Sequence, residues 1–204
     1  MKLQPKKLIV IAVAGLAGGA TWIAVDLRKP VSADLRQFDP EEVARLDTQM
    51  WRSYYDKQRL KLFRELALLL RQQYHLPLLR SYVVGLHAAK AAFVFKDGNS
   101  RSDYERALPD LFDYYGALRK VSTTPFDVDR AARLELEWWI VHRERKSRPT
   151  GDLDRALADL AAEFYQLPAV RFSDHARYRA EAMVIRDDLA ETTGVSEDPI
   201  YLKS

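Results

Sequence analysis

The sequence contains no cysteine, which excludes disulfide bonds, thiolate metal ligands and a cysteine nucleophile. It also lacks any run of five or more basic residues. The formal net charge is +3, and residues 1–29 hold five basic side chains and one acidic one, so residues 30–204 are left with a charge of −1. A near-neutral domain offers no basic surface for the phosphates of nucleic acid, so we expect no nucleic-acid partner.

Catalytic and cofactor-binding motifs are also missing. There is no G-x-S-x-G elbow, phosphate-binding loop, H-E-x-x-H pair or dinucleotide fingerprint. No Glu-x-x-His pair of the kind that binds di-iron centres in helical bundles occurs either. The histidines are isolated from one another along the chain, so any metal site would need ligands from separate helices. We therefore expect no cofactor and no metal, and we favour a protein that is not an enzyme.

One long apolar run stands near the N-terminus. Residues 8–25, LIVIAVAGLAGGATWIAV, contain no charged side chain. As a helix rising about 1.5 Å per residue, this run spans roughly 27 Å, close to the thickness of a bilayer's hydrocarbon core. We expect residues 1–29 to form an uncleaved membrane anchor. The alternative is a signal peptide cleaved near residues 18–20.

The charges beside the anchor predict its orientation and its glycines predict a partner. Lys2, Lys6 and Lys7 precede the apolar run, so the tail should stay in the cytoplasm and the rest of the chain should be exported, to the periplasm if the cell is bacterial. Gly15 and Gly19 are four residues apart, which lets a second membrane helix approach closely. We expect a protein partner or a homo-oligomer formed through this helix. Alternatively, the glycines reflect the usual composition of membrane helices.

The remainder of the chain reads as helix throughout, because prolines lie at segment boundaries and no stretch alternates like a half-buried strand. We divide it into a linker at 30–38, a helical domain at 39–194 and a tail at 195–204. The fold class is therefore all-α, with one N-terminal transmembrane helix followed by a six-helix bundle. The six helices are expected at 39–74, 77–95, 102–120, 124–146, 152–167 and 174–192.

Two helical hairpins resemble each other. SDYERALPDL at 102–111 and GDLDRALADL at 151–160 share six of ten positions, and the helices that follow align Glu135 with Glu181. Such spacing is typical of repeated hairpins in stacked helical arrays. If the repeat exists, both glutamates should occupy matching places, each facing an arginine. Chance similarity in a sequence rich in Ala, Leu, Arg and Asp is the alternative.

The stretch LELEWWIVHRER at 134–145 is unusual because its apolar residues surround the helix instead of lining one face. A helix that is apolar on all sides is buried by neighbours on several sides. We therefore interpret 128–141 as the central helix, with Trp138 and Trp139 both largely buried.

Two polar residues share one stripe of this helix. Glu135 and His142 fall between the two tryptophans on the helical wheel, about 10.5 Å apart along the axis, so a ligand could bridge them. They are our first ligand-binding candidates. Alternatively, Glu135 pairs with an arginine such as Arg179 and His142 lies in solvent, which is more common for such residues.

Two further surfaces are candidates. Arg80, His87 and Lys90 lie near one face of the helix at 77–95 and suit an anion or a lipid headgroup, although the same pattern fits a solvent-facing surface. Aromatic and basic residues alternate in MWRSYYDKQRLK at 50–61, which suits a headgroup zone or an ordinary surface helix. Its interaction candidates are Trp51, Arg52, Tyr54 and Tyr55.

The sequence thus favours a membrane-anchored helical interaction or scaffold protein, such as an accessory subunit of a membrane complex. The alternative is a membrane-tethered enzyme or small-ligand binder that uses polar residues of the central helix.

Overall fold

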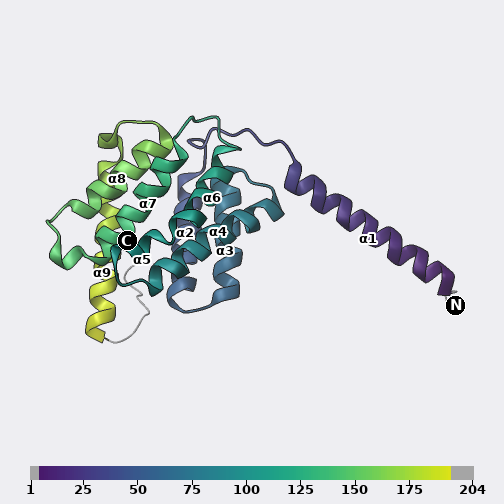
Figure 1. Cartoon of the computed structure of the whole chain (residues 1–204), viewed down its shortest axis with the longest axis horizontal. Coiled ribbons are helices and arrows are strands. Elements are labelled where there is room, and N and C mark those ends of the chain that lie inside the picture. Colours follow the sequence, from purple (N-terminus) through teal and green to yellow (C-terminus); the bar gives the residue numbers. More distant parts are fainter. Residues whose placement is uncertain (1–4, 194–204) are drawn as a thin grey trace.

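The computed structural model describes the backbone of residues 5–193 and the side chains of residues 17–192 except 55 and 190. Helix α1 (Pro5–Arg28) stands away from a helical domain that holds the other helices (Figure 1). The domain contains α2 (Pro40–Tyr55), α3 (Arg59–Tyr74), α4 (Leu78–Asp97), α5 (Arg101–Glu105), α6 (Leu108–Arg119), α7 (Val128–Arg143), α8 (Asp152–Tyr165) and α9 (Ser173–Thr193). Two short 3-10 helices, η1 (Arg145–Ser147) and η2 (Ala169–Phe172), join the last three.

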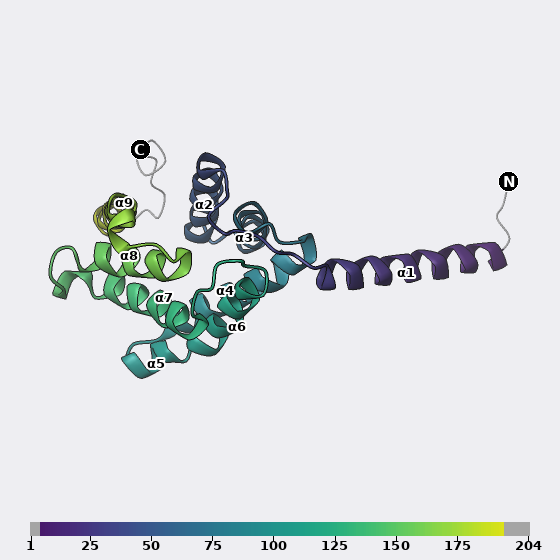
Figure 2. The ribbon, with the colours of Figure 1, turned by 90° about the horizontal axis from the view of Figure 1, so that it is seen from above.

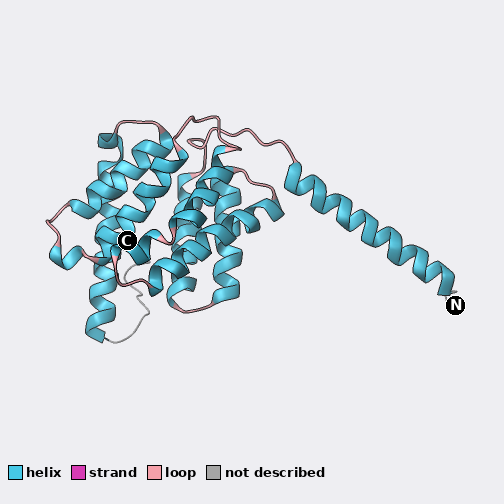
Figure 3. Cartoon of the chain, viewed as in Figure 1, coloured by secondary structure: helices cyan, strands magenta, loops and turns pink. Residues whose placement is uncertain are grey.

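The all-α expectation is confirmed. Within residues 5–193 the backbone forms no strand, and its only β-type pairing is an isolated bridge between Ala33 and Ser122 (Figure 3). That bridge lies in the segment expected as a linker. Residues 30–38 in fact pack on the domain, because Leu35 is fully buried and the backbone N–H of Ala33 donates to the carbonyl oxygen of Val121.

The expected single helix at 39–74 is wrong, because the chain reverses at residues 56–58. Asp39 caps α2 as its motif predicts, with its side chain accepting from the backbone N–H groups of Glu41 and Glu42. After α2, Lys57 adopts a left-handed conformation with φ of 59°, and the N–H of Gln58 donates to the carbonyl oxygen of Ser53. Helices α2 and α3 therefore pack against each other as a hairpin.

The expected helix at 102–120 is also divided in two, so the count of six domain helices is wrong. Ser100, not Ser102, caps α5 by accepting from the N–H of Asp103. A proline clashes with the carbonyl group four residues before it in a helix, and Pro109 lies four residues after Glu105, where α5 ends. Pro109 instead occupies the first turn of α6, where its missing N–H costs nothing.

The domain helices pack mainly on their neighbours in chain order, from α2 on α3 through α4, α6, α7 and α8 to α9. Seen from above, they follow a curved path with α2 and α9 at its two ends (Figure 2). Their buried side chains form two clusters, one centred on α3, α4, α6 and α7 and the other on α7, α8 and α9.

Helix α7 belongs to both clusters, which confirms its central position. Leu136 and Ile140 are buried in the first cluster, and Trp138 and Val141 in the second. Trp138 is 4% exposed, as expected, whereas Trp139 is only partly buried and packs against both clusters. The helix starts at Val128 behind the capping residue Asp127, not at the expected Thr124.

The repeated hairpins form as helix pairs, since α6 packs on α7 and α8 on α9. The expected equivalence of their glutamates is wrong. Glu135 is partly buried, whereas Glu181 is exposed and pairs with Arg177 of its own helix at 3.3 Å. The repeat therefore extends to the arrangement of helices and not to the surroundings of these residues.

One helix with described side chains, α4, is long and apolar enough to cross a membrane. Length and composition alone are weak evidence, because the core helix of a soluble protein meets the same criteria. In this fold α4 packs on both α3 and α6. The apolar run at residues 8–25 falls within α1, and the side chains of this helix are described from residue 17 onward.

Candidate functional site

Glu135 occupies a polar site inside the helical domain. Its Oε2 accepts a hydrogen bond from the hydroxyl of Tyr115 on α6 at 2.7 Å, and its Oε1 accepts one from the indole Nε1 of Trp139 at 2.9 Å. Trp139 lies one turn further along α7, so the sequence spacing itself brings this donor to the carboxylate. Each carboxylate oxygen therefore has a donor from within the chain.

The surroundings of Glu135 raise the pKa of its carboxyl group. Burial raises its pKa, and the hydrogen bond from Tyr115 and the positive charge of Arg179 offset this only in part. Arg179 is the arginine that the sequence-based alternative names as a partner of Glu135, and its positive charge acts on this carboxyl group. A carboxyl group with a raised pKa is one of the signatures of functional sites, although structural networks show it too.

Tyrosines from three helices surround this glutamate. Tyr74 of α3 and Tyr114 of α6 lie close enough to affect each other's pKa, and burial raises the pKa of both phenols, so both stay neutral. Tyr165 of α8 accepts a hydrogen bond from Nε2 of Gln73 at 2.9 Å. We call Tyr74, Tyr114, Tyr115, Glu135 and Tyr165 the tyrosine–glutamate cluster.

Sequence reasoning found Glu135 but missed these tyrosines. A helical wheel tells which face of its own helix a residue occupies, but the cluster is assembled from α3, α6, α7 and α8. The adjacent pair Tyr114–Tyr115 gives no signal of its own in a sequence with ten tyrosines.

His142 has partners different from those of Glu135. Its Nε2 lies 3.0 Å from Oδ2 of Asp187 on α9, and the same carboxylate oxygen is 3.2 Å from Arg145. Burial opposes ionisation of Asp187, but His142, Arg145 and Arg186 together outweigh it and lower the pKa of this carboxyl group. The structure therefore does not join Glu135 and His142 in one site.

The three candidates on α4 are not brought together as an anion site. The guanidinium of Arg80 donates to the carbonyl oxygens of Leu27 and Lys29 at 2.7 and 2.8 Å. His87 faces two carboxylates of α6, Asp110 and Asp113, while Lys90 is exposed.

The candidates at 50–61 lie at the end of α2 and around the turn into α3, not on one continuous helix. The rings of Trp51 and Tyr54 pack edge to face with centroids 5.6 Å apart, and Arg52 is exposed. The side chain of Tyr55 lies outside the described residues. In α1, a Cβ at Gly19 would meet no atom within 4 Å, whereas the surroundings of Gly15 lie outside the described part.

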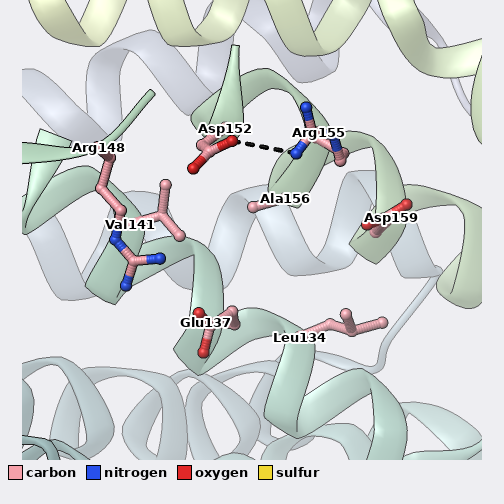
Figure 4. A pocket seen from close by; sticks show the side chains of 8 residues that line it. All are labelled: Leu134, Glu137, Val141, Arg148, Asp152, Arg155, Ala156 and Asp159. Carbon is pink, nitrogen blue, oxygen red and sulfur yellow. Dashed lines mark hydrogen bonds and ion pairs between the residues drawn. The ribbon is translucent and has the colours of Figure 1, made fainter. Parts of the chain in front are cut away.

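A hollow of about 190 Å³ lies between α7 and α8 (Figure 4). Its charged lining is largely paired within the chain. Asp152 binds Arg155 at 3.0 Å, Arg148 binds Glu144 at 2.6 Å, and Glu137 binds Arg101 at 2.8 Å. Such pairing leaves the hollow little charge with which to attract a ligand.

Comparison of this chain with models of protein families, with curated proteins and with solved structures finds no match.

Proposed function

We propose that this protein is a membrane-anchored interaction module, an accessory subunit of a membrane complex, with its helical domain outside the cytoplasm. In this proposal α1 holds the chain in the bilayer, and α4 provides the surface that binds a second membrane-anchored polypeptide.

The anchor is supported by the character of α1. The charge-free run at 8–25 falls within this helix, which projects from the domain (Figure 1). Its last turns leave Trp22, Ile23 and Val25 exposed. An isolated helix with apolar side chains exposed to water would be unfavourable, whereas lipid would cover them. Protease added outside spheroplasts should digest the domain, and digestion only after permeabilisation would refute this orientation.

The anchor and the domain are joined by direct contacts. The side chain of Asp26 accepts hydrogen bonds from the backbone N–H groups of Leu79 and Arg80 at the start of α4, at 2.7 and 3.3 Å. Arg80 returns two hydrogen bonds, one to the carbonyl oxygen of Leu27 in the last turn of α1 and one to that of Lys29. The beginning of α4 is thereby held beside the end of the anchor. A partner helix that packs along α1 can therefore also contact α4.

An exposed apolar stripe on α4 is the observation that carries the proposal. Val83, Leu86 and Phe93 are 47%, 45% and 44% exposed. Stepping about 100° per residue places these three within one face of the helix. Single exposed apolar residues are ordinary, but a stripe of them on one helix is typical of a surface that a partner covers.

Site-specific cross-linking tests the binding surface. A photo-reactive phenylalanine analogue at position 93 should form an adduct with another membrane polypeptide in intact membranes. The same analogue in place of Leu60, which is 90% exposed on α3, is the control and should form none. The cross-linked polypeptide should no longer co-purify with the Phe93→Glu variant in mild detergent. The melting temperature of this variant should equal that of the wild type. Equal cross-linking at both positions, or none at 93, would refute the α4 surface.

Ligand binding at the tyrosine–glutamate cluster is the second candidate. It is supported by the convergence of polar groups from several helices on one carboxyl group of raised pKa. Glu135→Gln keeps the shape of the side chain while removing its charge. If the cluster binds a ligand, this variant should lose a small molecule that co-purifies with the wild type, as seen by mass spectrometry. If no such molecule is found in the wild type, this candidate fails.

A further inference from the structure

A histidine and two aspartates meet between α4 and α6, on helices that pack side by side. Nδ1 of His87 lies 3.7 Å from Oδ1 of Asp110 and 3.6 Å from Oδ2 of Asp113. The two aspartates are three residues apart, so they project from the same face of α6. One potential ligand atom from each side chain lies within 4.8 Å of the other two.

The distances do not correspond to hydrogen bonds. Nδ1 of His87 is shielded from solvent and has no hydrogen-bond partner among the described residues. Separations of 3.6 and 3.7 Å are too long for the proton of an imidazole to bind a carboxylate oxygen well. A buried polar atom without a partner is costly, and native structures usually satisfy it.

The same distances suit two ligands of one metal ion. Zinc binds histidine nitrogen and carboxylate oxygen at about 2.0–2.2 Å, and tetrahedral geometry then separates two ligand atoms by roughly 3.4 Å. The observed separations exceed this by a few tenths of an ångström. The oxygens of the two aspartates lie within 4.8 Å of each other, so their side chains would rotate toward the ion on binding it.

We propose that His87, Asp110 and Asp113 bind a divalent transition-metal ion, with zinc as the best fit. One imidazole nitrogen and two carboxylate oxygens suit zinc, whereas magnesium and calcium prefer oxygen ligands alone. Asp113 is 67% exposed in its side chain, so the fourth position opens to solvent. The bound ion would connect α4 to α6 beside the apolar stripe, and this site does not depend on the proposed partner.

The competing explanation is a protonated histidine held between two carboxylates. That arrangement needs no metal and predicts no saturable zinc binding. The surroundings of His142 offer an instructive contrast, because there Arg145 and Arg186 lie against the carboxylate of Asp187 and occupy the space that a cation would need.

Zinc titration of the full chain in mild detergent, purified without a histidine tag and treated with chelator, tests the proposal. The wild type should bind one zinc ion in calorimetry and melt at a higher temperature with zinc than with magnesium. Loss of even an outer partner of a metal ligand typically costs 10–100-fold in affinity. Asp113→Asn, an exposed change that leaves the core intact, should therefore weaken zinc binding by at least about tenfold.

His87→Gln should weaken binding at least as strongly, and His75→Gln is the control. His75 is an exposed histidine whose Nε2 lies 2.9 Å from the carbonyl oxygen of Gln37. Unchanged zinc affinity in Asp113→Asn, an equal loss in His75→Gln, or no saturable binding by the wild type would each overturn the proposal. If His87→Gln fails to fold, Asp113→Asn alone decides.

Discussion

Removing the hydroxyl of Tyr115 should destabilise the domain without disturbing its packing. This hydroxyl donates to Oε2 of Glu135 at 2.7 Å, and it contacts the carboxyl group whose pKa burial raises. Tyr115→Phe keeps the aromatic ring, which packs edge to face with Phe126 and Phe164 at 6.2 and 5.8 Å. The change therefore isolates one hydrogen bond.

The magnitude depends on the protonation state of Glu135. A hydrogen bond to a charged group contributes about 1.5–3 kcal/mol, and one between neutral groups about 0.5–1.5 kcal/mol. The variant should accordingly lose about 2 kcal/mol at neutral pH if the carboxylate is ionised there, and less in acid. For a domain of this size, such a loss lowers Tm by roughly 4–8 °C.

The wild-type protein should show a matching pH dependence. Because the pKa of Glu135 is raised on folding, the folded state binds its proton more tightly than the unfolded state does. The resulting stabilisation is fully present below the ordinary glutamate pKa, and it is lost as pH rises through the folded-state value. Glu135→Gln cannot ionise, so its stability relative to the wild type should increase across that window.

Urea unfolding of the full chain in mild detergent, followed by tryptophan fluorescence, measures these differences. Tyr178→Phe is the matched control, because Tyr178 is exposed on α9 and should tolerate the change. The double variant Tyr115→Phe with Glu135→Gln gives the coupling energy between the two groups. A loss below about 0.5 kcal/mol at neutral pH, or a coupling energy near zero, would refute the assigned role of this hydrogen bond.

Three further predictions follow from other contacts. Trp138→Ala should cost about 3–5 kcal/mol in the same assay, because Trp138 is 4% exposed, and a loss below about 1 kcal/mol would contradict its core position. The pKa of Asp187 is lowered on folding, so its ionised carboxylate stabilises the folded state. This stabilisation is present above the unfolded-state pKa and is lost as pH falls through the folded-state pKa. The wild type's stability advantage over Asp187→Asn should therefore shrink in acid, and an advantage independent of pH would argue against it. Arg80→Ala removes the hydrogen bonds to the carbonyl oxygens of Leu27 and Lys29, so trypsin should cleave faster after Arg28, and an unchanged rate would show that the junction is held by other contacts.

The helix starts that were predicted correctly carry local signals. Asp39 caps the start of α2, and α8 begins at the expected Asp152, directly after Gly151 with its φ of 89°. The division at Pro109 was also readable, because the ring clash of an internal proline is a local rule.

The turn at 56–58 could not be read in the same way. It contains neither glycine nor proline, and Lys57 adopts its left-handed conformation without a residue type that favours it. Packing of α2 against α3 decides this turn, and such tertiary contacts override the local preference for one long helix. Tyr115, the partner of Glu135 on α6, escaped prediction for the same reason, since it arrives from another helix.

The polar residues of α7 also help to decide between the two proposed functions. Glu135 ties α7 to α6 through Tyr115, and His142 lies against Asp187 of α9, so each connects the central helix to a neighbour. Both oxygens of Glu135 already accept hydrogen bonds from the fold, so this carboxyl group needs no ligand to satisfy it. The exposed apolar side chains of α4, by contrast, are left uncovered by the domain. Burying a large apolar side chain contributes about 1.5–3 kcal/mol, so a partner that covers this stripe gains free energy without breaking contacts of the fold.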